Sequence, residues 1–187
     1  MKERRLGMGW SPFYYVEVFN HNKNKWEKVE IFTKRDGKFE EVDLWWANGT
    51  HELFSVLGFE ESYDVPEFDA MHDGLPGNVS EGIKKDYDHF NSYREEDHPI
   101  TNNEVKFFNL ADALLYLKDN PKVKDEDKME EIWRAGEVEW DKVEKVYMTN
   151  PLKSLVDQVY SYIEFGKGNF FWNNSASDVR VVTFMFR

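Results

Sequence analysis

The chain has 187 residues, enough for one compact domain, and it contains no cysteine, which excludes disulfide scaffolds, thiolate metal sites and cysteine nucleophiles. Its 24 basic and 36 acidic residues give a net charge of −12. A protein that binds duplex DNA normally carries the opposite charge, because neutralisation of phosphates supplies most of its affinity. No apolar run approaches the roughly 20 residues that span a bilayer. We expect a soluble intracellular protein without direct nucleic-acid or membrane contacts.

The aromatic content is high, with 7 Trp, 9 Tyr and 15 Phe. A core of this size absorbs many rings, and we expect most of them to be buried. Large rings that stay at the surface are the usual anchors of a protein interface. The composition therefore fits a binding protein whose carboxylates attract a basic partner surface.

The first part of the chain predicts a three-stranded antiparallel meander. Residues 13–20 and 25–34 are rich in β-forming side chains, and the polar sequence between them suits a hairpin turn. The sequence RDGK at 35–38 predicts a second turn, and 39–46 a short third strand. Residues 178–186 predict a final strand, whose apolar character indicates a central place in the sheet.

Two shorter helices are predicted in the first half of the chain. One lies within 48–59, where Thr50 is the expected cap and Gly58 the expected end. The other begins near Ser80, although Gly82 weakens it.

Two further helices carry stronger signals. Residues 109–120 begin with an Asn cap and place their apolar side chains on one face. Residues 150–166 begin with the cap Asn150 and Pro151, and end at Gly166. With the strands, these helices predict one α+β domain, an antiparallel sheet (N-terminal meander plus C-terminal strand) packed by several helices.

Two regions are candidate partner-binding surfaces. The densely charged segment 121–146 has a sparse apolar stripe, on which two Trp residues share a helix face if the helix continues past Gly136. A Trp pair on the third predicted strand must point to opposite faces, so one ring is left for a covering helix or a partner. The candidate binding residues are Trp45, Trp46, Glu130, Trp133, Glu137 and Trp140.

Signals of catalysis are weak, and we predict neither a catalytic residue nor a cofactor. The chain has no Gly-rich phosphate loop, nucleophile elbow or His pair at helical metal spacing. The loop 60–78 is long enough to be functional. Within it, Asp69, His72 and Asp73 are the best metal-ligand candidates, but they lack calcium-loop spacing, and a polar loop without metal is the ordinary interpretation.

Five stretches stand in this order along the chain: MGWSPFYYVEV from Met8, THELFSVLG, DGLPGNVSEGIKKDYDHF, FFNLADALLYL and DVRVVTFMFR. They resemble successive segments of an uncharacterised bacteriophage protein family whose members begin Met-Gly-Cys-Asp-Ile-His. The family counterparts are that start, a Tyr-Asp-Leu-Phe-Ala-Ile-Leu segment, an Arg-Gly-Leu-Pro loop with its helix, a Trp-Leu-Thr-Leu-Ala-Glu-Leu segment and the last strand. The resemblance implies a divergent member of that family.

The departures from the family pattern concern its polar groups. Trp10, Ser11 and Phe13 stand where the family has Cys, Asp and His. Residues 102–107 replace a stretch of the Gly-His-Ser-His type, and 185–187 replace a terminal Asp-Asn. The resemblance therefore implies a scaffold without the family's metal or catalytic chemistry, whose surface carries the function.

The resemblance also bears on the basic leader. Met8 matches the family start, so the preceding KERRLG has no counterpart, and Lys-Glu-Arg-Arg is what a purine-rich ribosome-binding sequence encodes. We expect residues 1–7 to be a leader, either untranslated because the true start is Met8 or a disordered basic tail. We expect 8–187 to form the single domain.

The favoured function is a phage-encoded acidic binding protein, in the cytoplasm of the infected bacterium, that inhibits or redirects a host protein. In size and acidity the chain resembles staphylococcal phage inhibitors of the kind that bind the primary sigma factor of RNA polymerase, which makes this factor the best candidate partner. An anti-restriction or anti-CRISPR inhibitor fits the same features. A small metal-dependent phage enzyme that uses the 60–78 loop is a further candidate, as is a virion component, which the charge disfavours.

Overall fold

The computed structural model describes residues 11–29, 32–35, 38–41, 44–45, 51–59, 65–94, 99–125, 128–129, 131, 134, 146–165 and 175–186. The leader 1–7, the expected cap Thr50, and the glycines Gly136 and Gly166 lie outside these ranges.

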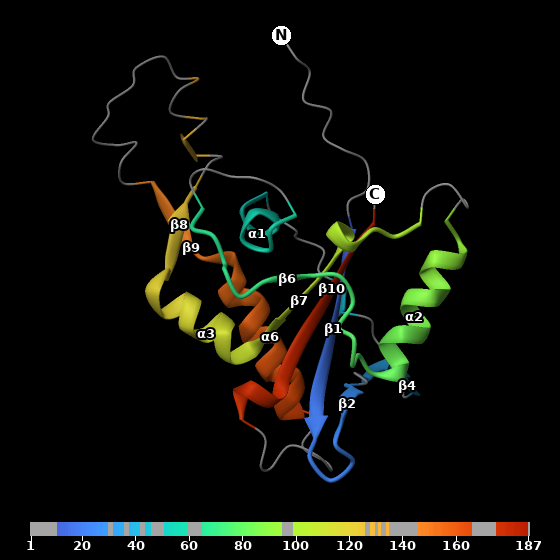
Figure 1. Ribbon diagram of the computed structural model, residues 1–187. Helices are drawn as coiled ribbons and strands as arrows, with labels where there is room; N and C mark the ends of the chain where they lie inside the picture. The colour runs from blue at the N-terminus through green and yellow to red at the C-terminus, as the bar shows by residue number, and fades with distance from the viewer. Residues whose placement is uncertain are drawn as a thin grey trace.

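A six-stranded antiparallel sheet forms the centre of the described structure, in the order β2–β1–β10–β7–β6, with β5 also paired to β1 (Figure 1). The strands are β1 (Ser11–Asn20), β2 (Lys25–Lys28), β5 (Leu44–Trp45), β6 (His72–Asp73), β7 (Val105–Asn109) and β10 (Val179–Phe186). The predicted α+β class is confirmed, and β10 lies between β1 and β7, which confirms its central place.

The N-terminal strands differ in one detail from the prediction. The expected second strand is divided, since β2 pairs with β1 while β3 (Phe32–Arg35) pairs with β4 (Lys38–Glu41) in a separate hairpin. β5 then returns to the edge of β1 that β2 also occupies. Arg35 pairs with Lys38, so only two residues separate the strands in the sequence, a spacing typical of a locally closed hairpin. The hairpin is therefore an excursion from one edge of β1.

Helices cover both faces of the sheet. In Figure 1, α2 (Glu81–Ser92) lies to the right of the sheet, and α3 (Leu110–Asp119) and α6 (Pro151–Phe165) lie to the left. Side chains alternate along each strand. Tyr15, Val182 and Phe184 accordingly pack in the cluster under α2, and the residues between them face the larger cluster of α1 (His51–Val56), α3 and α6.

The predicted helix ends are confirmed where they are described. Ser80, Asn109 and Asn150 accept hydrogen bonds from N–H groups of the first turns of α2, α3 and α6, at 3.4, 2.9 and 3.0 Å. Gly58 follows α1 with a φ of 69°, the left-handed conformation that ends many helices. These local signals thus set where α2, α3 and α6 begin.

Gly82 has a packing role in α2. A Cβ at this position would lie 3.2 Å from the Cβ and Cδ of Lys28. The Lys28 Nζ lies 2.7 Å from the Asp86 carboxylate one turn further along α2. The glycine that weakens the helix in isolation thus lets it approach β2 closely.

Replacing Gly82 by alanine should therefore not raise the free energy of unfolding by the roughly 0.5–1 kcal/mol expected when alanine replaces glycine inside a helix. In a Lys28→Ala background the same replacement should be more favourable than in the parent, because the contact with Cδ is removed while the contact with the Cβ remains. Urea unfolding of the four proteins measures this coupling, and Lys84→Ala, at an exposed position of α2, is the control background. An equal gain in all backgrounds would contradict the packing role.

Candidate functional site

The predicted binding residues are only partly within the described ranges. Trp45 lies in β5, where it pairs with Phe13 of β1. The other five lie outside the described residues: Trp46, Glu130, Trp133, Glu137 and Trp140.

The segment that carries four of these residues begins and ends on a small two-stranded sheet. β8 (Lys122–Lys124) pairs antiparallel with β9 (Tyr147–Thr149). At the end of this strand pair that adjoins residues 126–145 in the sequence, the Asp125 N–H donates to the Val146 carbonyl at 3.1 Å. The residues on either side of the segment 126–145 therefore lie next to each other.

Asn150 secures this pair of strands to the helices. It is fully buried, its N–H donates to the Pro121 carbonyl at 3.0 Å, and its side-chain amide donates to the Asn120 carbonyl at 2.9 Å. The same side chain caps α6. One asparagine thus joins the end of α3, the start of β8 and the start of α6, and these contacts form the base of the segment.

Asp125 organises the first turn of the segment. Its carboxylate accepts the Lys128 N–H at 3.0 Å, and its carbonyl accepts the N–H of Met129, which is buried. Burial raises the pKa of Asp125, but the hydrogen bonds from the Lys128 N–H and ammonium outweigh it and hold the pKa below its usual value. The carboxylate is therefore committed to holding this turn.

Four large apolar side chains are well exposed among the described residues: Tyr93, Leu115, Tyr147 and Tyr160. Tyr147 lies on β9, opposite Lys124, and half of its surface is accessible. An exposed ring therefore stands on the strand that follows residues 126–145 in the chain.

The three candidate metal ligands do not converge. His72 and Asp73 are adjacent in β6, so their side chains project to opposite faces of the sheet. His72 stacks on Phe107, with ring centroids 4.9 Å apart, and Asp73 accepts a hydrogen bond from Lys106 at 2.5 Å. Within the described part of the chain, no three His, Asp or Glu side chains are grouped closely enough to hold a metal.

The described part of the 60–78 loop is anchored to the core. Phe68 is buried against the rings of Phe108 and Tyr116, at centroid distances of 5.6 and 4.9 Å. The Tyr116 hydroxyl donates to the Pro66 carbonyl at 2.7 Å. The short strand β6 within this loop was not predicted, because two residues carry no periodic signal. These contacts hold the loop against the core at Pro66 and Phe68.

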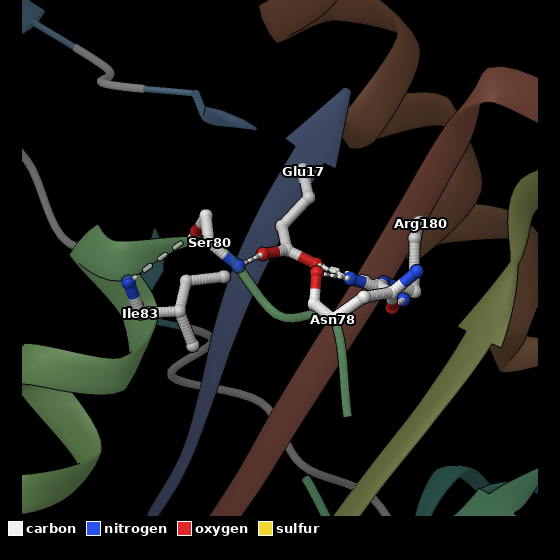
Figure 2. Close-up of polar contacts among 5 residues, drawn as sticks. All are labelled: Glu17, Asn78, Ser80, Ile83 and Arg180. Carbon is white, nitrogen blue, oxygen red and sulfur yellow. Dashed lines mark hydrogen bonds and ion pairs between the residues drawn. The ribbon is translucent and has the colours of Figure 1, made fainter. Parts of the chain in front are cut away.

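A buried ion pair on the face covered by α2 is a feature that sequence reasoning missed (Figure 2). Glu17 is fully buried and Arg180 nearly so. The Arg180 Nε donates to Glu17 Oε2 at 2.7 Å, and Nη2 donates to the same oxygen. The guanidinium carbon lies 4.2 Å from the ring centroid of Trp26 and 5.6 Å from that of Phe107. A single charged residue in each of two apolar strands, VEV and VRVV, was the available signal.

The remaining acceptor and donor atoms of this pair hold the chain that precedes α2. Glu17 Oε1 accepts the Ser80 N–H at 2.6 Å, and Arg180 Nη1 donates to the Asn78 side-chain oxygen at 2.9 Å. Both charges are paired and hydrogen-bonded, as buried charges must be. The cluster can position a segment, but it leaves neither charge open for chemistry.

Among the described residues, no helix is both long and apolar enough to cross a membrane. Comparison of the chain with protein-family models, with characterised proteins and with solved structures gives no match.

Glu104 is expected to make stability fall in acid. Burial raises its pKa, but the Thr101 N–H and the Arg94 guanidinium outweigh burial and lower the pKa below the ordinary value of 4.5. The unfolded chain therefore takes up the proton first, so this stabilisation is complete above about pH 4.5 and is lost as the pH falls through the folded-state pKa.

Urea unfolding between pH 7 and pH 3 tests this expectation. Glu104→Gln should be less stable than the parent at pH 7 and should lose less stability on acidification. Glu67→Gln, which changes an exposed carboxylate, should follow the parent. Equal acid slopes for the parent and Glu104→Gln would contradict the assignment.

Tyr14 presents a buried hydroxyl in the core. Its ring is 2% exposed, the hydroxyl has no hydrogen-bond partner among the described residues, and burial raises the pKa of the phenol. Tyr14→Phe should therefore stabilise the protein by about 1 kcal/mol, because a desolvated polar group is removed. Tyr116→Phe is the matched control and should destabilise by about 1 kcal/mol, since its hydroxyl is bonded. Loss of stability in Tyr14→Phe, measured by urea unfolding, would contradict this.

Proposed function

We propose that the protein is a phage-encoded acidic binding protein that engages a basic surface of a host bacterial protein. The best candidate partner is the primary sigma factor of RNA polymerase, in the cytoplasm of the infected cell, where binding would inhibit transcription. The observation that carries the proposal is the base formed by β8, β9 and Asn150. It brings the two ends of the segment 126–145, whose sequence contains Trp133 and Trp140, to one place on the molecule.

Charge supports a basic partner. The excess of acidic over basic residues, 36 against 24, creates a field that accelerates encounter with a positive surface. Affinity then depends on a few large rings that become buried in the complex. Trp133 and Trp140 have the residue type and spacing for this role, and the exposed ring of Tyr147 stands at the base of the same segment.

The arrangement of the 60–78 loop favours a binding function over the metal-dependent enzyme. His72 and Asp73 face opposite sides of the sheet, and Asp73 already neutralises Lys106. The same net acidic charge would suit an anti-restriction or anti-CRISPR inhibitor, so binding experiments decide the identity of the partner.

The test is calorimetric titration of the purified protein into purified primary sigma factor at two salt concentrations. We expect binding that weakens with salt. Trp133→Ala and Trp140→Ala should each raise the Kd by about 30-fold, the cost of losing an interface anchor of roughly 2 kcal/mol. Circular dichroism of each variant checks that it is folded.

The matched control is Tyr93→Ala, at the end of α2 and outside the segment, which removes the most exposed large ring among the described residues. It should leave the Kd within about twofold of the parent, as expected for a residue outside the interface. No binding to sigma factor would overturn this choice of partner. Binding that is unchanged in both Trp variants would overturn the assignment of the segment as the binding surface.

A further inference from the structure

Residues 74–94 form an excursion whose two ends are bound at one place. The Gly74 N–H donates to the Asn102 carbonyl at 3.1 Å and to the Val105 carbonyl at 2.7 Å. At the other end, the Arg94 guanidinium donates to both carboxylate oxygens of Glu104, at 3.2 and 3.1 Å. Gly74 has a φ of 84°, a conformation that glycine adopts readily. The excursion therefore has a compact base at residues 102–105, and we call residues 75–93, which include α2, the flap.

The far part of the flap is held by the buried ion pair. Figure 2 shows Glu17 between Arg180 and the Ser80 backbone, with Asn78 beside the guanidinium. The Glu17 carboxylate thus bonds the residue that caps α2, and Arg180 bonds the residue two positions earlier. Since Glu17 and Arg180 belong to the paired strands β1 and β10, these bonds attach the flap to the centre of the sheet.

The remaining attachments of the flap are two part-buried polar contacts and a small apolar cluster. The Lys28 Nζ donates to the Asp86 carboxylate at 2.7 Å, and the Asn91 side-chain oxygen accepts the Ile100 N–H at 2.9 Å.

The apolar contacts of the flap are limited. Ile83 is fully buried, while Tyr87 and Phe90 are partly buried and lie against Phe184 and Phe13. The buried cluster on this face is much smaller than the one that α1, α3 and α6 form on the other face. Segments with less buried apolar surface open at lower free energy than the global unfolding free energy.

We propose that the flap opens as a unit about its base at residues 102–105, and that the Glu17–Arg180 pair is the latch that keeps it closed. Opening breaks the bonds to Ser80 and Asn78, and with them the ion pair between Lys28 and Asp86. It uncovers the apolar sheet surface formed by Tyr15, Val182 and Phe184. This inference stands apart from the proposed function, because it concerns the opposite face of the sheet from α3 and α6.

Native-state hydrogen exchange of the full chain, measured by NMR at low urea concentrations, tests the flap. In the parent protein, the amides of α2 should exchange through one common opening that depends weakly on urea, while those of α3 and α6 exchange only by global unfolding. Glu17→Gln should speed exchange of the α2 amides by about 100-fold, since a buried arginine loses its countercharge. Glu27→Gln, a carboxylate of β2 that pairs with Lys23 at the surface, should leave α2 exchange unchanged.

A core variant on the opposite face separates the flap from the whole fold. Val159→Ala, in α6, should speed exchange of the α3 and α6 amides by about tenfold or more and leave the α2 amides unchanged, because the closed-to-open step of the flap does not involve that core. Equal rates and equal urea dependence for α2, α3 and α6 in the parent would overturn the proposal. So would acceleration of α2 by Val159→Ala as large as that of α6. Neither of these two measurements requires Glu17→Gln to fold.

Discussion

The pairing of β1 with β10 is the constraint on which the other elements depend. Eight successive residue pairs, from Ser11 with Phe186 to Val18 with Val179, set two faces at once. One face receives α2, and the other receives α1, α3 and α6. The pair Glu17 and Arg180 lies within this register, so a shift by one residue would move a charge to the larger apolar core. The buried ion pair therefore penalises every alternative register more than an apolar pair would.

Aromatic side chains lower the free-energy cost of burying the Glu17–Arg180 pair. The Arg180 guanidinium lies over Trp26 and near Phe107, so ring faces cover it where water would otherwise be needed. His72 stacks on Phe107 in turn, at the edge of the sheet. Some of the rings that the composition suggested as interface anchors thus serve the fold. Rings that remain exposed, such as that of Tyr147, are the candidates for contact with a partner.

Local chemistry was predictable from the sequence, and long-range chemistry was not. The caps Ser80, Asn109 and Asn150 act within three residues, and each helix begins where its cap indicates. The excursion of β3 and β4 depends on which edge of β1 accepts β5, which no local pattern encodes. Proximity in sequence suggested a shared metal for His72 and Asp73, but β6 places them on opposite faces. The partners Glu17 and Arg180 are 163 residues apart, and only the register brings them together.

That separation has a consequence for synthesis on the ribosome. β1 emerges early and can pair with β2 and β5 within a few seconds, but its other edge waits for β10. At about 5–20 residues per second, the delay is on the order of ten seconds. During that time the nascent chain carries an unpaired strand edge, apolar on one face, and a glutamate that lacks its arginine. Chaperones bound at the ribosome are thus expected to meet this protein before its sheet can close.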